Sequence, residues 1–141
     1  MNMNKNEALS FLIAHQPMPD DEDLTQELID KYDEVRKYFI AHPEKQAIPL
    51  FLNSYGNGDG LGVYQVVEDF FYQFESEDVI PQIRNILEDS STSESVRYWV
   101  TQLAAAFPDD SLKKGLELSL KSNNDDIIEA AQLALDIIED A

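Results

Sequence analysis

Apolar positions along this chain recur with a period of 32 residues. Segments 47–74, 79–106 and 111–138 can be aligned without gaps, and apolar residues then fall in register. The register positions hold, in chain order, Ile48, Ile80 and Leu112; Tyr64, Val96 and Ile128; Val67, Trp99 and Ala131; Phe71, Leu103 and Leu135; and Phe74, Ala106 and Ile138. A fixed period of this length, with two helical halves in each copy, is typical of an α-solenoid. The pattern therefore predicts an all-α fold that works through an extended surface.

Helical spacing extends over nearly the whole sequence. Before the repeats, it predicts one helix over about 6–15 and a second over about 23–41. Within the repeats, the predicted helices are, in order, about 44–55, 61–74, 77–89, 93–107, 109–121 and 124–139. We therefore expect one domain, 1–141, of about four helix hairpins. Its parts are a divergent terminal repeat at 1–43 and full repeats at 44–76, 77–108 and 109–141.

Polar residues at the expected helix boundaries support these limits. The acidic run Asp20–Asp23 suits the positive N-terminal end of the second helix. Four further residues stand where a helix needs an N-cap: Ser76, Ser93, Asp110 and Asn124. His15 and His42 lie near the C-terminal ends of the first two helices, and we interpret them as caps rather than as metal ligands.

The charge balance narrows the range of partners. The chain has 28 acidic and 10 basic residues, and its formal net charge is −18. Binding to nucleic acid through phosphates requires a basic surface, and an anionic membrane requires the same, so both classes are disfavoured. A strongly acidic surface suits a basic protein partner, whose approach it would accelerate. The alternative is that the charge serves solubility alone.

The cysteine content and the search for targeting segments restrict the possible compartment and chemistry only slightly. The chain has no cysteine, which excludes disulfides and thiolate chemistry. The apolar stretch at residues 11–14 is too short for a signal peptide, and no segment reaches transmembrane length. We therefore expect a cytoplasmic protein.

A glycine-rich segment at residues 55–62 invites three interpretations. A phosphate-binding loop would need a preceding strand, whereas the preceding segment has helical spacing. Asn57, Asp59, Gly62 and Glu68 match part of the spacing of an EF-hand calcium loop, but Leu61 stands where an oxygen ligand belongs. We therefore interpret the segment as the turn between two helices of one repeat, with a recognition loop as the remaining alternative.

A polar stripe on the second helix of each repeat is our candidate contact surface. In the first repeat it comprises Gln65, Asp69 and Tyr72. The equivalent positions in the next two repeats are Arg97, Thr101 and Ala104, and then Glu129, Leu133 and Asp136. The residues that we expect to contact a partner are Asp59, Gln65, Glu68, Asp69, Tyr72, Arg97, Asp125, Asp126 and Glu129. A merely solvated helix face is the alternative.

The 32-residue helix pairs, with Ile48-Pro49 and Ile80-Pro81 at corresponding positions, resemble HEAT-like repeat proteins over about residues 23–141. The period is shorter than is usual for HEAT repeats, and their typical turn residues are not clear here. Within that group, a small acidic chain is similar to the immunity proteins of bacterial toxin–immunity pairs, including contact-dependent inhibition systems. This second resemblance implies an inhibitor of a cognate, often basic, toxin domain, and it supplies no site residues.

These observations favour a binding protein over an enzyme. No Gly-x-Ser-x-Gly or His-Glu-x-x-His motif is present, and we expect neither catalysis nor a cofactor. The first hypothesis is an immunity protein that neutralises a basic toxin domain. The alternatives are a DNA-mimicking inhibitor of a nucleic-acid enzyme and a general scaffold or adaptor. The sequence leaves the oligomeric state open.

Overall fold

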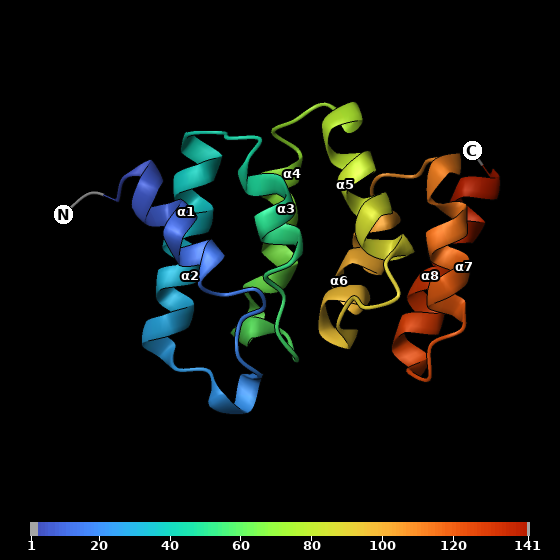
Figure 1. Ribbon diagram of the computed structural model, residues 1–141, viewed down its shortest axis with the longest axis horizontal. Helices are drawn as coiled ribbons and strands as arrows, with labels where there is room; N and C mark the ends of the chain where they lie inside the picture. The colour runs from blue at the N-terminus through green and yellow to red at the C-terminus, as the bar shows by residue number, and fades with distance from the viewer. Residues whose placement is uncertain (1–2, 141) are drawn as a thin grey trace. The chain divides into compact units, whose positions relative to one another are not determined.

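The computed structural model describes residues 3–140, and this part of the chain is helical without any β-strand (Figure 1). The all-α prediction is therefore confirmed. The α-helices are α1 (Lys5–Ile13), α2 (Gln26–Ala41), α3 (Ala47–Leu52), α4 (Glu68–Phe71), α5 (Ser76–Glu88), α6 (Glu94–Ala104), α7 (Lys113–Leu120) and α8 (Asp125–Asp140). Short 3-10 helices are η1 (Asp21–Asp23), η2 (Gly60–Gly62), η3 (Tyr64–Val66) and η4 (Asp110–Leu112). None of the described helices combines the length and the apolar character that crossing a bilayer requires.

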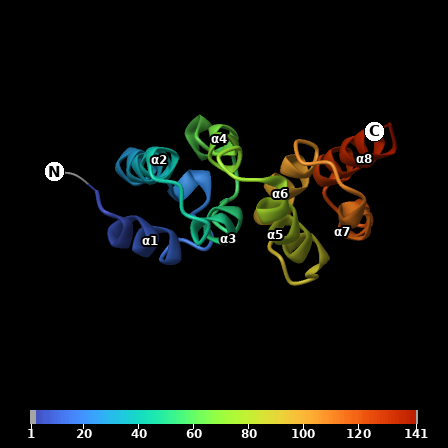
Figure 2. The same cartoon turned by 90° about the horizontal axis from the view of Figure 1, so that it is seen from above.

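The chain divides into two compact units, which we call unit 1 (residues 1–75) and unit 2 (residues 76–141). Their boundary falls one residue before the start of the repeat predicted at 77. In unit 2, α5 packs against α6 and α7, and α8 packs against α6 and α7 (Figure 2). The division into a terminal repeat and three full repeats stays a prediction.

An aromatic cluster forms the core of unit 1. Tyr32 lies edge-on to Phe51 and to Tyr64, with ring centroids 6.1 and 5.7 Å apart. Each such pair adds about 0.5–1.5 kcal/mol beyond the burial of its area. The Tyr32 hydroxyl donates to Ser54 Oγ at 2.6 Å, and Ser54 Oγ donates to the Phe51 carbonyl at 2.7 Å. Because these buried polar atoms are satisfied, the core tolerates them.

The core of unit 2 follows the predicted helical spacing. Leu103 and Leu135, at equivalent repeat positions, are both buried, whereas Trp99 is only half-buried. Gly115 explains how closely α5 and α7 approach, since a Cβ there would lie 2.5 Å from Leu87 Cβ. Most of the register positions of the repeat are therefore buried, because each helix turns its apolar stripe inward.

The regular helix predicted over 61–74 is wrong. The structure breaks this segment into η2, η3 and α4. Gly60, Leu61 and Gly62 have φ angles of 60°, 52° and 92°, and an α-helix cannot accommodate positive φ. Tyr64 and Phe71 nevertheless remain buried as the repeat predicts.

The second helix begins three residues later than the predicted start at about 23. Residues 21–23 form η1, and α2 begins after Thr25, whose Oγ1 accepts the Leu28 amide at 3.1 Å. The acidic run therefore lies outside α2, and Thr25 rather than an acidic side chain caps it.

The remaining helix ends agree with the sequence in part. Asn124 Oδ1 accepts the amides of Asp126 and Ile127 at the start of α8, as predicted. Asp109, rather than Asp110, caps η4, and Ser93 precedes α6 without a side-chain cap bond. Ser76 is the first residue of α5. Finally, Nδ1 of His15 bonds to the Phe11 carbonyl, and Nδ1 of His42 to the Tyr38 carbonyl, each four residues earlier in its helix.

Candidate functional site

A single carboxylate holds the glycine-rich segment of unit 1 in place. Asp21 Oδ2 accepts the Asp59 amide and Oδ1 accepts the Gly60 amide, both at 3.0 Å. The Asp21 amide in turn donates to the Asn57 carbonyl at 2.9 Å. Hydrogen bonds to an ionised carboxylate are stronger than neutral ones. These three bonds therefore fix η1 against the loop that follows α3 (Figure 1).

Glycine is required where the two segments meet. Gly58 has a φ of 114°, and a Cβ there would lie 2.2 Å from Asp21 Cγ. At Gly56, a Cβ would lie 2.5 Å from the Met18 carbonyl oxygen. The interpretation of this segment as a turn that needs glycine is confirmed. Its partner, Asp21, could not be found from local sequence, because it precedes Asp59 by 38 residues.

Leu61 occupies an unusual conformation in this turn. It is the one non-glycine residue with positive φ among the described residues (φ 52°, ψ 34°), and it lies between Gly60 and Gly62. Its side chain is 50% exposed. A left-handed backbone costs a residue with a Cβ about 1–2 kcal/mol. Neither the backbone conformation nor the exposed apolar side chain favours folding, and such strain concentrates at functional positions.

A cluster of acidic side chains lies on the segment that Asp21 bonds to the loop of Leu61. Asp20, Glu22 and Asp23 are exposed, and a carboxylate oxygen of each lies within 4.8 Å of the others. The Asp21 bonds join this segment to the backbone of Asp59 and Gly60, which directly precede Leu61. We call the exposed residues Asp20, Glu22, Asp23, Asp59 and Leu61 the Leu61 surface.

The acidic cluster of this region is not the calcium loop considered from the sequence. Among residues 3–140, the carboxylates of Asp20, Glu22 and Asp23 lie close enough together to share one ion. Exposed acidic groups are common without a bound ion. We therefore interpret the cluster as a source of negative potential.

The predicted polar stripe of unit 1 follows the Leu61 surface in the sequence, and its side chains are exposed. Gln65, Asp69 and Tyr72 are accessible, and Glu68 is half-buried. The Tyr72 hydroxyl donates to Glu68 Oε1 at 2.6 Å. This hydrogen bond, more than burial, raises the pKa of Tyr72 to about 12, because the carboxylate favours the protonated phenol. Tyr72 therefore presents a neutral ring.

The prediction that Arg97 belongs to an exposed stripe is wrong. Its side chain is 9% exposed, and Thr101 and Ala104 on the same face are also buried. The Arg97 guanidinium donates to Ser119 Oγ on α7 at 2.7 Å. This face of α6 is therefore an internal contact of unit 2, and the polar stripe does not continue through the middle repeat.

The other predicted contact residues lie at the start of α8. Asp125, Asp126 and Glu129 are exposed. Asp126 and Glu129 line a groove of about 360 Å³ between α6 and α8. Leu133, which sequence reasoning placed on the stripe but not among the contacts, lines the same groove and is 57% exposed. Apart from the buried Arg97, the predicted contact residues thus form two groups, one in unit 1 and one in unit 2.

Comparison with known proteins does not identify the chain. No protein-family model matches it, and neither a curated protein nor a solved structure matches at a significant level.

Proposed function

We propose that this chain is a protein-binding module that recognises a basic partner through the Leu61 surface. The observation that carries the proposal is an exposed leucine, held in a left-handed conformation, in a loop that is hydrogen-bonded to a segment with three exposed carboxylates. Burying a leucine side chain is worth about 1.5–3 kcal/mol. Surrounding acids would steer a cationic surface toward it and reject acidic competitors. An apolar anchor inside a charged rim is the usual arrangement of a specific protein interface.

The repeat character supports a more specific proposal. In unit 2, the pair α5–α6 packs on the pair α7–α8 through α5–α7 and α6–α8 contacts. This is the packing expected if the 32-residue repeats stack as a short, HEAT-like α-solenoid. We propose that the partner is the cognate toxin domain of a bacterial toxin–immunity pair, which the chain inhibits. The exposed Leu61 argues against DNA mimicry, because the phosphate backbone that such an inhibitor imitates has no apolar side chain to match it.

The proposal is tested by capture and by one substitution. The protein is purified from its native host, or with the product of the neighbouring reading frame, and a captured partner is identified by mass spectrometry. Leu61→Asn then removes the apolar side chain, while asparagine tolerates the left-handed backbone. We expect its affinity for the partner to fall about tenfold to a hundredfold, and its stability to be unchanged or higher.

A matched control uses the second exposed leucine. Leu133→Asn, on the regular helix α8, should leave the affinity within about twofold if Leu61 is the anchor. Joint neutralisation of Asp20, Glu22 and Asp23 to amides should slow association at low salt more than it changes dissociation. Capture of acidic proteins alone, or equal affinities for Leu61→Asn and wild type, would overturn the proposal.

A further inference from the structure

The groove between α6 and α8 in unit 2 combines carboxylates with an exposed apolar side chain. Its volume is about 360 Å³, at the small end of the range for ligand sites. Asp126, Glu129 and Leu133 line it from α8, and Tyr98 and Ala105 line it from α6. Among the described residues that line it, none is a lysine or an arginine. The groove therefore suits a ligand that is cationic at one point and apolar at another.

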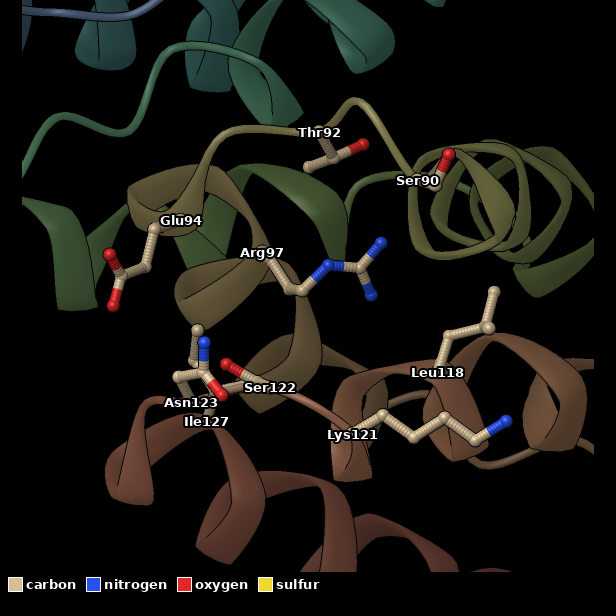
Figure 3. A pocket seen from close by; sticks show the side chains of 9 residues that line it. All are labelled: Ser90, Thr92, Glu94, Arg97, Leu118, Lys121, Ser122, Asn123 and Ile127. Atoms are coloured by element: carbon tan, nitrogen blue, oxygen red, sulfur yellow. The ribbon is translucent and has the colours of Figure 1, made fainter.

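The carboxylates and the leucine lie at different ends of the groove. Asn124 Nδ2, just before α8, donates to Glu94 Oε1 at the start of α6 at 2.6 Å, so the two helices begin side by side. Figure 3 shows this end of the pair, with Glu94 close to the loop that enters α8. Glu129 precedes Leu133 by four residues and Asp126 precedes it by seven, which is about 6 and 10 Å along the helix. The groove is therefore acidic near the helix starts and apolar farther along.

The pocket that Figure 3 draws is a neighbouring one, and its charge is already satisfied. Its arginine, Arg97, donates to Ser119 Oγ at 2.7 Å. The other bonds of this guanidinium go to the carbonyls of Leu87 and Asp89, and the Asp89 carboxylate interacts with it as well. A ligand in that pocket would compete with these contacts, so the groove between α6 and α8 is the better candidate.

The acidic end of the groove is accessible to a cation. Asp126 and Glu129 are exposed, and neither forms an ion pair with another of residues 3–140. Unpaired acids are expected in a chain with 28 acidic and 10 basic residues, so they indicate no ligand on their own. Here they share the groove with the half-buried Tyr98, whose ring face attracts a cation. A guanidinium group in the groove would therefore have a ring on one wall and two carboxylates on the other.

The apolar end of the groove exposes a leucine. Leu133 is 57% exposed, although it lies well inside α8, whose other apolar side chains are mostly buried. Beside it, the small side chains of Ala105 and Ala130 leave the groove open. An apolar side chain seated there would cover Leu133 and release water from both surfaces.

An α-helix fits this groove better than an extended peptide does. Both walls are α-helices, whose backbone N–H and C=O groups are bonded within each helix. An extended peptide would therefore find no backbone partners there, whereas a helix satisfies its own. On a helix, side chains four or seven residues apart share one face, which matches the spacing of Leu133 from Glu129 and Asp126.

We propose that this groove binds a basic amphipathic helix of a protein partner. An arginine of that helix lies between Tyr98 and the two carboxylates, and an apolar side chain one or two turns away covers Leu133. A second copy of this chain is a poor occupant, because both copies would carry a net charge of −18. The groove lies in unit 2 and takes a ligand separate from the partner of the Leu61 surface, so each proposal can fail alone.

The test is a titration of the full chain with synthetic peptides, followed by the fluorescence of Trp99. This is the one tryptophan of the chain, and its ring centroid lies 5.2 Å from that of Tyr98. The probes are alanine-based helical peptides of about 15 residues without aromatic side chains. In one, an arginine precedes a leucine by four residues, and in the other their order is reversed, because the direction of the bound helix is open.

We expect a saturable change in fluorescence with at least one of the two peptides. A matched peptide with glutamate in place of arginine should bind about tenfold more weakly or not at all, because it meets two carboxylates. Failure of both arginine peptides to saturate, or equal binding by the glutamate peptide, would overturn the proposal.

Substitutions on α8 separate the groove from general attraction between opposite charges. Glu129→Gln should weaken binding of the arginine peptide about threefold to tenfold. Glu139→Gln removes the same charge from the same helix at an exposed position outside the groove, and it should bind within about twofold of the wild type. Equal losses for the two variants would show that no specific site is involved and would overturn the proposal.

Leu133→Asn tests the apolar end. It should weaken binding of the peptide about tenfold, because the apolar contact is lost. The same variant should keep its affinity for the partner of the Leu61 surface, which distinguishes the two proposals. Unchanged binding of the peptide by Leu133→Asn would overturn the assignment of this groove.

Discussion

At the scale of single residues, backbone contacts decide the structure around the candidate site. Asp21 accepts from two amides of the loop, whereas its neighbours Asp20, Glu22 and Asp23 remain exposed. Gly58 permits the approach, because any side chain there would meet Asp21. The sequence indicates that the loop needs glycine, but it does not indicate which distant side chain the loop binds.

Two glycines of the same loop allow strain to be separated from steric contact. Gly58→Ala introduces both, since φ is 114° and the new Cβ would lie 2.2 Å from Asp21 Cγ. Gly62→Ala introduces strain alone, because φ is 92° but no atom lies within 4 Å of the new Cβ. We expect losses in unfolding free energy of about 3 and 1 kcal/mol respectively. Urea denaturation measures both, and equal losses would contradict the account of the Asp21 contact.

At the scale of the element, helix ends follow local rules and helix interiors follow the repeat. α8 begins where Asn124 can accept two amides. Positive φ angles at Gly60, Leu61 and Gly62 exclude the start of the helix predicted over 61–74, and the rest of that segment forms η3 and α4. Local chemistry predicts the cap at Asn124 correctly, but Ser93 makes no side-chain cap bond and Asp109 caps η4 in place of Asp110, so neither caps nor apolar period alone fix the helix limits.

The caps of α6 and α8 provide a matched pair of substitutions. Asn124→Ala should lower the unfolding free energy by about 1 kcal/mol, because two amides lose their acceptor. Ser93→Ala should change it by less than about 0.5 kcal/mol, since Ser93 makes no side-chain cap bond. Chemical denaturation gives both values.

A third variant separates capping from the bond to Glu94. Asn124→Asp keeps the cap acceptor but removes the Nδ2 donor that reaches Glu94. It should therefore remain within about 0.5 kcal/mol of the wild type if capping dominates. A loss as large as that of Asn124→Ala would assign the stability to the Glu94 bond instead.

At the scale of the whole molecule, the charge is the dominant property. A net charge of −18 repels itself in the compact state. Adding salt shortens the screening length from about 30 Å at 10 mM to about 8 Å at 150 mM. We expect the thermal midpoint to rise by about 3–5 °C over this range, as followed by circular dichroism.

Choline chloride is the control for this prediction. Choline screens charge but is too large to be held by the three carboxylates of the Leu61 surface. Equal rises in choline chloride and sodium chloride would assign the effect to screening. A midpoint that does not rise with either salt would show that self-repulsion has little influence on stability.

The sequence by itself determined the helical class, the burial of most register positions of the repeat and the acidic character of the chain. These properties follow from local periodicity and composition, because the apolar spacing within each amphipathic helix indicates which of its faces is buried. Only the tertiary structure decided that Arg97 lies inside unit 2, and that Asp21 joins the acidic segment to the glycine loop that carries Leu61. A contact between residues 38 positions apart depends on how the elements are arranged in the tertiary structure. Whether a polar helix face packs inside the protein or faces solvent depends on the same arrangement, and no local sequence pattern encodes it.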